Sequence, residues 1–156
     1  MADLILDNTY LILLLPLWIF LIIMCGRFFA VYVNKAIIYA LTLLSSLLGL
    51  LFCGVSLTRV DSVIEQTIPF IKINDFMLYF GIHIDKFSLI VALTLFLVSF
   101  CVQLFSISYM KNEPKTYRFY ALLNLFNFAM AGLIFSPNLF QLYAFWELVG
   151  VISYAL

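Results

Sequence analysis

The sequence predicts an all-α membrane protein with five transmembrane helices and a short β-hairpin in the outer loop between the second and third helices. Of its 156 residues, 66% are hydrophobic and 10% are charged, whereas soluble domains contain roughly 45–50% and 25%. This composition excludes a water-soluble globular protein. The eight basic and eight acidic residues cancel, so bulk charge also gives no basis for binding nucleic acid.

Four long stretches without charge predict the helices. They cover residues 8–26, 36–58, 87–110 and 119–146. A helix needs about 20 residues to cross a bilayer, so each of the first three predicts one span. The fourth is too long for one span and is interrupted at Ser136-Pro137-Asn138, where proline and polar neighbours end one helix and start another. The predicted helices cover residues 10–26, 36–57, 87–110, 119–135 and 138–156, and we expect one membrane unit over residues 1–156.

The N-terminus and the basic residues predict the orientation. Acidic Asp3 and Asp7 stand where a secretory signal would be basic, so the first helix is expected to be retained. The connections after the first and third helices contain the following basic residues: Arg27, Lys35, Lys111, Lys115 and Arg118. Short loops rich in Lys and Arg stay on the side of synthesis, so the N-terminus and the second-to-third loop are expected outside.

The outer loop has the pattern of a hairpin. Hydrophobic residues alternate with others at Ile71 and Ile73, and again from Phe80 to Ile84. Asn74-Asp75 between them is typical turn chemistry. Pro69 is expected at the start of the hairpin, where a missing N–H does little harm.

No metal or redox centre is predicted on this chain. Cys25, Cys53 and Cys101 lie far apart in apolar runs, which predicts small core residues rather than metal ligands. His83 is the only histidine, and we expect it to be a polar residue at the membrane interface.

Glu147 is the candidate functional residue. It lies about 14 Å into the fifth predicted helix, near the midplane of a bilayer core about 30 Å thick. An acidic group there costs roughly 2.5–3.5 kcal/mol, so it should face protein or water. Three hypotheses remain: a proton-carrying group tuned by a mobile lysine, a static buried ion pair, or a protonated and hydrogen-bonded carboxyl.

Residues near Glu147 are expected to support it. Gly150 and Ser153 follow at three and six residues, and such small residues permit close approach of another helix. Trp146 is expected to pack or to lie at the interface. No Lys or Arg lies within the predicted helices, so a cationic partner must come from another polypeptide, or Glu147 works alone.

The C-terminal run FQLYAFWELVGVISYAL resembles the fifth transmembrane helix of the antiporter-like subunits of respiratory complex I, specifically chain 5 of NADH-quinone oxidoreductase. The run GIHIDKFSLIVALTLFLVSFCVQLFSISYM, with Asp85 at its helix entrance, is similar to that family's third helix. The run KNEPKTYRFYALLNLFNFAMAGLIFSPNLFQLY is similar to the following loop, fourth helix and polar turn. The resemblance covers residues 80–156; residues 1–79 agree in helix count and outer hairpin.

The resemblance implies a role in NADH:ubiquinone reductase coupled to proton translocation. Glu147 matches the family's membrane glutamate, which pairs with a lysine on a later helix in a proton half-channel. The resemblance implies no cofactor on this chain, with NADH, FMN, iron-sulfur clusters and quinone elsewhere in the complex. Its partners would be other membrane-arm subunits, in the mitochondrial inner membrane or a bacterial plasma membrane.

The chain departs from the family in length, because family members continue through many more helices. A split gene, a fragment and a degenerate subunit would each explain this. We expect a split subunit whose second polypeptide carries the partner lysine. The alternatives are a non-transporting assembly subunit, or a subunit of a related cation/proton antiporter or membrane-bound hydrogenase.

Overall fold

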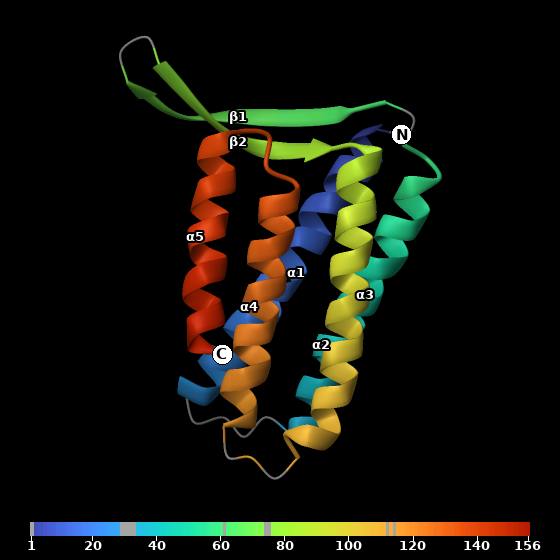
Figure 1. Cartoon of the computed structure of the whole chain (residues 1–156), viewed down its shortest axis with the longest axis vertical. Coiled ribbons are helices and arrows are strands. Elements are labelled where there is room, and N and C mark those ends of the chain that lie inside the picture. The colour runs from blue at the N-terminus through green and yellow to red at the C-terminus, as the bar shows by residue number, and fades with distance from the viewer. Residues whose placement is uncertain (1, 29–33, 61, 74–75, 112, 114) are drawn as a thin grey trace.

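The fold is a bundle of five helices with a two-stranded hairpin lying across one end (Figure 1). The computed structural model describes the chain except residues 1, 29–33, 61, 74–75, 112 and 114. The helices are α1 (Ala2–Phe28), α2 (Lys35–Leu57), α3 (Lys86–Tyr109), α4 (Thr116–Ile134) and α5 (Leu139–Ala155), and the strands are β1 (Ile64–Ile73) and β2 (Phe76–Ile84). The predicted helices and hairpin are therefore confirmed as elements.

Membrane crossing is supported for three helices. Among the described residues, α1, α2 and α3 contain segments long and apolar enough to span a bilayer: Thr9–Gly26, Lys35–Leu57 and Lys86–Tyr109. α5 is apolar but only 17 residues long. α4 contains Arg118, Asn124 and Asn127, which lower its mean hydropathy. Crossing by all five helices stays a prediction.

The helices reach further than the uncharged stretches. α2 begins at Lys35, α3 begins at Lys86, and α4 contains Arg118 in its first turn. The prediction that no Lys or Arg lies in the helices is therefore wrong at helix ends. The physical reason is that a charge ends an apolar stretch, whereas Lys and Arg are good helix formers that continue a helix.

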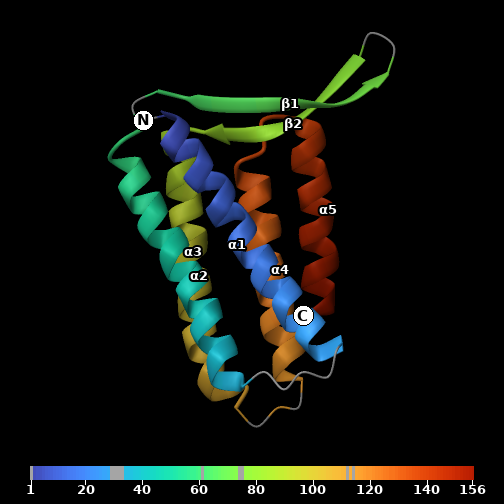
Figure 2. The same cartoon turned by 180° about the vertical axis from the view of Figure 1, so that it is seen from behind.

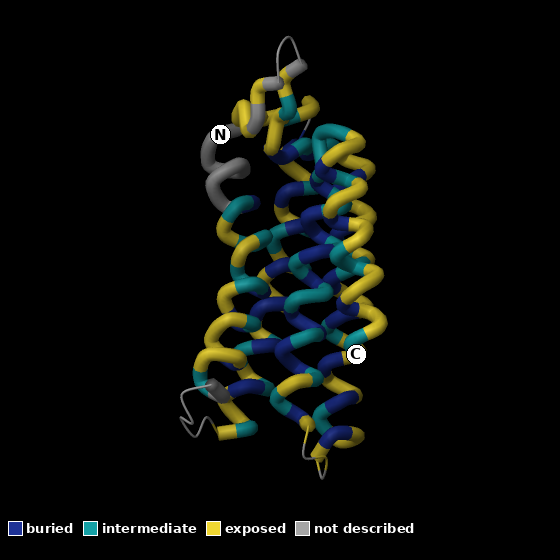
Figure 3. Tube along the Cα trace, turned by 90° about the vertical axis from the view of Figure 1, so that its left-hand side faces the viewer, coloured by how far each residue is buried: buried dark blue, intermediate teal, exposed yellow. Residues whose placement is uncertain are grey.

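α4 is the central helix and α5 lies at the edge. α4 packs against α1, α2, α3 and α5, while α2 pairs with α3. Figures 1 and 2 show from opposite sides that α5 stands beside α4 at one margin of the bundle. Buried residues follow the inside of the bundle in Figure 3, and exposed residues follow the outside. Many exposed side chains are large and apolar, such as Leu11 and Phe105 at 66% and 72%, as expected of a surface that faces lipid.

The hairpin is longer than predicted and contains Pro69 in its interior. β1 and β2 pair antiparallel from Ile64↔Ile84 to Ile73↔Phe76, with a register shift between Pro69 and Ile71. The prediction that Pro69 starts the hairpin is wrong. A bulge tolerates proline because the ladder is already interrupted there. The predicted turn residues Asn74 and Asp75 lie outside the described residues.

The cysteine prediction holds for one residue of three. Cys53 is buried in the core, whereas Cys25 and Cys101 are exposed. The core prediction is wrong for those two, because apolar sequence around a membrane helix does not distinguish its lipid-facing side from its buried side. His83 is half-buried on β2, and its Nδ1 lies 3.6 Å from the Glu65 carboxylate.

Candidate functional site

Glu147 occupies the middle of α5 and is exposed on the side turned away from the bundle. At 100° per residue, it lies about 160° around the helix from buried Phe145, which packs on α4. The exposed residues within about 60° of Glu147 around the helix are Phe140, Tyr143, Ala144, Gly150, Val151 and Tyr154. We call this set, with Glu147, the outer face of α5.

The orientation of α5 is set by a ring packed against a glycine. Phe145 is 8% exposed, and a Cβ added at Gly132 of α4 would lie 2.4 Å from the Phe145 ring. No side chain fits between them, so Gly132 allows the two helices to meet at this level. Because Phe145 points inward, Glu147 must point outward.

The start of α5 is tied to the hairpin by two amide side chains. The Asn138 side chain accepts the Gln141 N–H at 2.9 Å as an N-cap, and its Nδ2 donates to the Tyr79 carbonyl at 2.7 Å. The buried Gln141 amide forms two bonds of 2.9 Å with Gly81, accepting from its N–H and donating to its carbonyl. Gln141 thus pairs with β2 as a neighbouring strand would, and holds the hairpin on α5.

The predicted supporting residues differ in their relation to Glu147. Gly150 lies about 60° from it on the outer face, and a Cβ added there would meet nothing within 4 Å. Ser153 is also exposed but lies about 120° away, at the margin of that face. Trp146 is 62% exposed, so its packing role stays a prediction. Sequence reasoning missed Tyr143, one turn earlier on the same face, whose side chain interacts electrostatically with Glu147.

Among the residues whose side chains the structure describes, no cation pairs with Glu147. In the described part of the chain, an ion pair joins His83 and Glu65 on the hairpin. Arg118 reaches α5, but its Nη2 donates to the Ala155 carbonyl at 3.3 Å. Ala155 is eight residues from Glu147, about 12 Å along the helix. Within the described structure, Glu147 therefore faces outward without a counter-charge.

Asp85 caps α3 at the hairpin end. Its carboxylate accepts the Ser88 N–H at 2.7 Å, and its own N–H donates to the Ser88 hydroxyl at 2.9 Å. Hydrogen bonding to the Asp85 carboxylate, first by the Ser88 backbone and then by the Ser88 side chain, holds the pKa of Asp85 below its ordinary value. The structure therefore assigns the helix-entrance aspartate a capping geometry.

A buried polar layer between α2, α3 and α4 was not anticipated from the sequence. The Ser45 hydroxyl donates to Asn124 at 3.3 Å, and the Ser99 hydroxyl donates to Asn127 at 2.5 Å. Further members of the layer are Thr42, Ser46, Gln103 and Tyr120. Interhelical bonds of this kind hold membrane helices together.

The spacing of polar residues along the sequence could have predicted this polar layer. Ser99 and Gln103 are four residues apart, and Asn124 and Asn127 are three apart, which places each pair on one helix face. The sequence does not state which faces meet. The polar layer does not include Glu147, which lies on a different helix and points outward.

Comparison with known proteins identifies related sequences. The family model described as NADH-Ubiquinone oxidoreductase (complex I), chain 5 N-terminus, matches residues 70–120. The chain is 35% identical over 154 residues to NAD(P)H-quinone oxidoreductase subunit 5, chloroplastic, of Dioscorea elephantipes, covering 95% of this chain and 21% of that protein. It is 35% identical over 121 residues to NAD(P)H-quinone oxidoreductase chain 5 of Picosynechococcus, covering 76% of this chain and 18% of that protein. The chain thus spans about a fifth of the length of these relatives.

A solved structure has the same fold. A chain of the membrane-bound sulfane sulfur reductase, an archaeal respiratory membrane complex, superposes with a TM-score of 0.74 at 22% identity. The match covers 96% of this chain and 30% of the other. The fold of nearly the whole chain is therefore shared with a part of a larger membrane protein.

Proposed function

Because this chain belongs to the family of complex I chain 5 N-terminal segments, we propose that it contributes Glu147 to a proton half-channel in the membrane arm. The observation that carries the proposal is the position of Glu147. It lies in the middle of an apolar helix and faces outward, without a described counter-charge. An idle carboxylate there would be costly in lipid, so protein or water must cover it in the assembled complex.

The chemistry follows from the effect of a neighbouring charge. A carboxyl group in a medium of low polarity favours its neutral, protonated form, whereas a nearby lysine favours the carboxylate. Moving the lysine toward Glu147 therefore releases a proton, and moving it away takes one up. Tyr143 lies one turn before Glu147 on the same face and interacts with it electrostatically, so its hydroxyl is available as a polar neighbour of the carboxyl group.

The lysine comes from helices outside these 156 residues. Gly150 leaves open space beside Glu147, which permits the backbone of another helix to approach closely. The curated relatives are about five times as long, so they have room for those helices. A split subunit would supply them on a second polypeptide. Peptide mapping and intact mass of the isolated subunit decide this: a second polypeptide supports the split, and one continuous polypeptide contradicts it.

The catalytic role belongs to the assembly. Quinone reduction by NADH would take place on other subunits, with FMN, iron-sulfur clusters and quinone there and no cofactor on this chain. The partners are other membrane-arm subunits. The basic ends of the helices would face the side of synthesis, with the N-terminus on the opposite side. The mitochondrial inner membrane stays a prediction, and the relatives named above are chloroplastic or cyanobacterial.

The variant Glu147→Gln tests the proposal. It keeps the size and polarity of the side chain but removes the titrating group, so proton translocation per quinone reduced should fall several-fold in an assembled complex. Proton uptake in sealed vesicles measures this, with Glu65→Gln on the exposed hairpin as the matched loss of one carboxylate. Full translocation in a normally assembled Glu147→Gln complex would favour the non-transporting assembly subunit instead.

A related antiporter or hydrogenase subunit is distinguished by the electron donor. If NADH drives no quinone reduction in the membrane complex that contains this chain, the complex I assignment of the activity is wrong. Vesicles energised with NADH and a soluble quinone give that measurement directly.

A further inference from the structure

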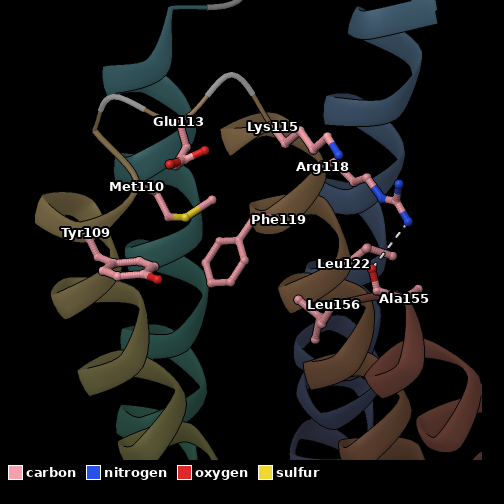
Figure 4. A pocket seen from close by; sticks show the side chains of 9 residues that line it. All are labelled: Tyr109, Met110, Glu113, Lys115, Arg118, Phe119, Leu122, Ala155 and Leu156. Carbon is pink, nitrogen blue, oxygen red and sulfur yellow. Dashed lines mark hydrogen bonds between the residues drawn. The ribbon is translucent and has the colours of Figure 1, made fainter.

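We propose that the basic end of the bundle holds the headgroup of an anionic phospholipid between α3, α4 and α5. A cavity of about 370 Å³ opens there, lined at its rim by Glu113, Lys115 and Arg118 and below them by apolar and aromatic side chains. Figure 4 shows Lys115 and Arg118 together on the α4 side, with Glu113 across the cavity toward α3. The inference rests on the membrane placement proposed above and goes beyond the role of Glu147.

The charge of this end favours an anion. Lys35 lies beside the cavity region, since its Nζ donates to the Lys111 carbonyl at 3.3 Å. Lys115 and Arg118 line the cavity itself, together with Glu113, so cationic side chains outnumber anionic side chains in its lining. Two other cavities, of about 300 and 150 Å³, have no charged residue in their lining. Of these three cavities, it is the one that basic side chains line.

The individual donors suit a phosphate group. Arg118 gives one long bond of 3.3 Å to the Ala155 carbonyl, and a guanidinium has five N–H donors, which can bind phosphate in a bidentate manner. α4 begins at this cavity without a side-chain cap on Lys115, so the positive end of its dipole adds to both cations. Glu113 stands apart from them (Figure 4), where it can accept from a headgroup hydroxyl.

The apolar lining indicates a lipid rather than free phosphate. Phe119 and Leu122 follow Arg118 along α4 and line the same cavity, so the path leads from the cations toward the middle of the bundle. Tyr109 is 72% exposed at the end of α3, as is common for an aromatic residue at a membrane interface. Basic pockets between membrane helices on the cytoplasmic side are suited to anionic headgroups.

Lipid retention by the intact complex tests the proposal. The complex is exchanged into detergent with equal amounts of phosphatidylglycerol and phosphatidylcholine, and bound lipid per complex is quantified by mass spectrometry. The double variant Lys115→Gln/Arg118→Gln should bind phosphatidylglycerol about thirty-fold more weakly, from a loss of about 5.5-fold per cation. The control variant Arg59→Gln/Lys72→Gln removes the same amount of charge at the hairpin end and should leave the retention of phosphatidylglycerol unchanged.

Further measurements show whether a phospholipid, free phosphate or polypeptide occupies the cavity. Glu113→Gln should increase retention of phosphatidylglycerol, and inorganic phosphate should not displace it. A density map of the unmodified complex should show a phosphate beside Lys115 and Arg118, which keeps the test valid if the variants fail to assemble. Unchanged retention in the double variant, displacement by phosphate, or polypeptide density filling the cavity would each overturn the proposal. Retention in Glu147→Gln should equal that of the unmodified complex, so the two proposals fail independently.

Discussion

The contact between α4 and α5 can be tested by adding one methyl group. In Gly132→Ala, the new Cβ would lie 2.4 Å from the Phe145 ring, with two further ring atoms at 2.5 and 2.7 Å. Ordinary contact begins at 3.4 Å, so the ring or the helix must give way by about 1 Å. Overpacking of this size typically costs 1–3 kcal/mol. Because Phe145 orients α5, the displacement should also move Glu147.

The assay combines stability with proton translocation. We expect the assembled Gly132→Ala complex to unfold at a lower temperature and to translocate fewer protons per quinone reduced. The second variant Gly132→Ala/Phe145→Leu removes the clash and should recover part of the stability, with a coupling energy of about 0.5–3 kcal/mol in the double-mutant cycle.

The control is another glycine-to-alanine change in the bundle. At Gly54 of α2 the nearest atom to an added Cβ is a Leu93 methyl at 4.0 Å. Gly54→Ala should therefore be neutral, or stabilising by up to about 1 kcal/mol through helix propensity. If Gly132→Ala behaves like Gly54→Ala, the steric account of how α5 is placed is refuted.

Three further predictions concern the ends and the outer face of the bundle. Gln141→Ala leaves the buried N–H and carbonyl of Gly81 without their partner, and should cost about 2–4 kcal/mol and expose the hairpin to protease; an unchanged digestion pattern would contradict this. Asp85→Ala should cost about 1 kcal/mol through the lost cap, measured by thermal unfolding against Asp85→Asn. The pKa of Asp85 is lowered in the folded protein, so the ionised carboxylate stabilises the fold above the unfolded pKa of about 3.9. This stabilisation disappears as the pH falls through the folded pKa. A difference in stability between wild type and Asp85→Asn that persists below this pH range would contradict the prediction. A Cβ added at Gly150 meets no described atom within 4 Å, so Gly150→Leu should leave the isolated bundle intact but weaken assembly of the complex; normal assembly would show that no helix packs there.

Much of the fold follows from the sequence. Uncharged stretches near 20 residues long are rare outside membranes, so their number and the break at Pro137 predicted five helices. Alternation around Asn74-Asp75 predicted the hairpin, although its length and the place of Pro69 were not predicted. Helix ends were misplaced because Lys35 and Arg118 end the apolar pattern without ending the helix.

The candidate site was also predicted only in part from the sequence. Glu147 stands out in sequence because a single carboxylate among uncharged residues carries a large desolvation cost wherever the helix is placed in lipid. The neighbouring residues carry no charge and no such cost, so the sequence identifies them only by their spacing from Glu147. Spacing placed Gly150 near Glu147, but left Ser153 at the margin of the outer face and did not identify Tyr143.

The sequence by itself determined that this is a helical membrane protein of the complex I chain 5 family, with one carboxylate in an apolar helix. The tertiary structure decided which way that carboxylate faces. The reason is that apolar residues surround α5 on all sides, so no amphipathic pattern marks its buried side. The fit of Phe145 against Gly132, the burial of Ile152 and the Gln141 bonds to Gly81 together select the rotation of α5 that turns Glu147 outward.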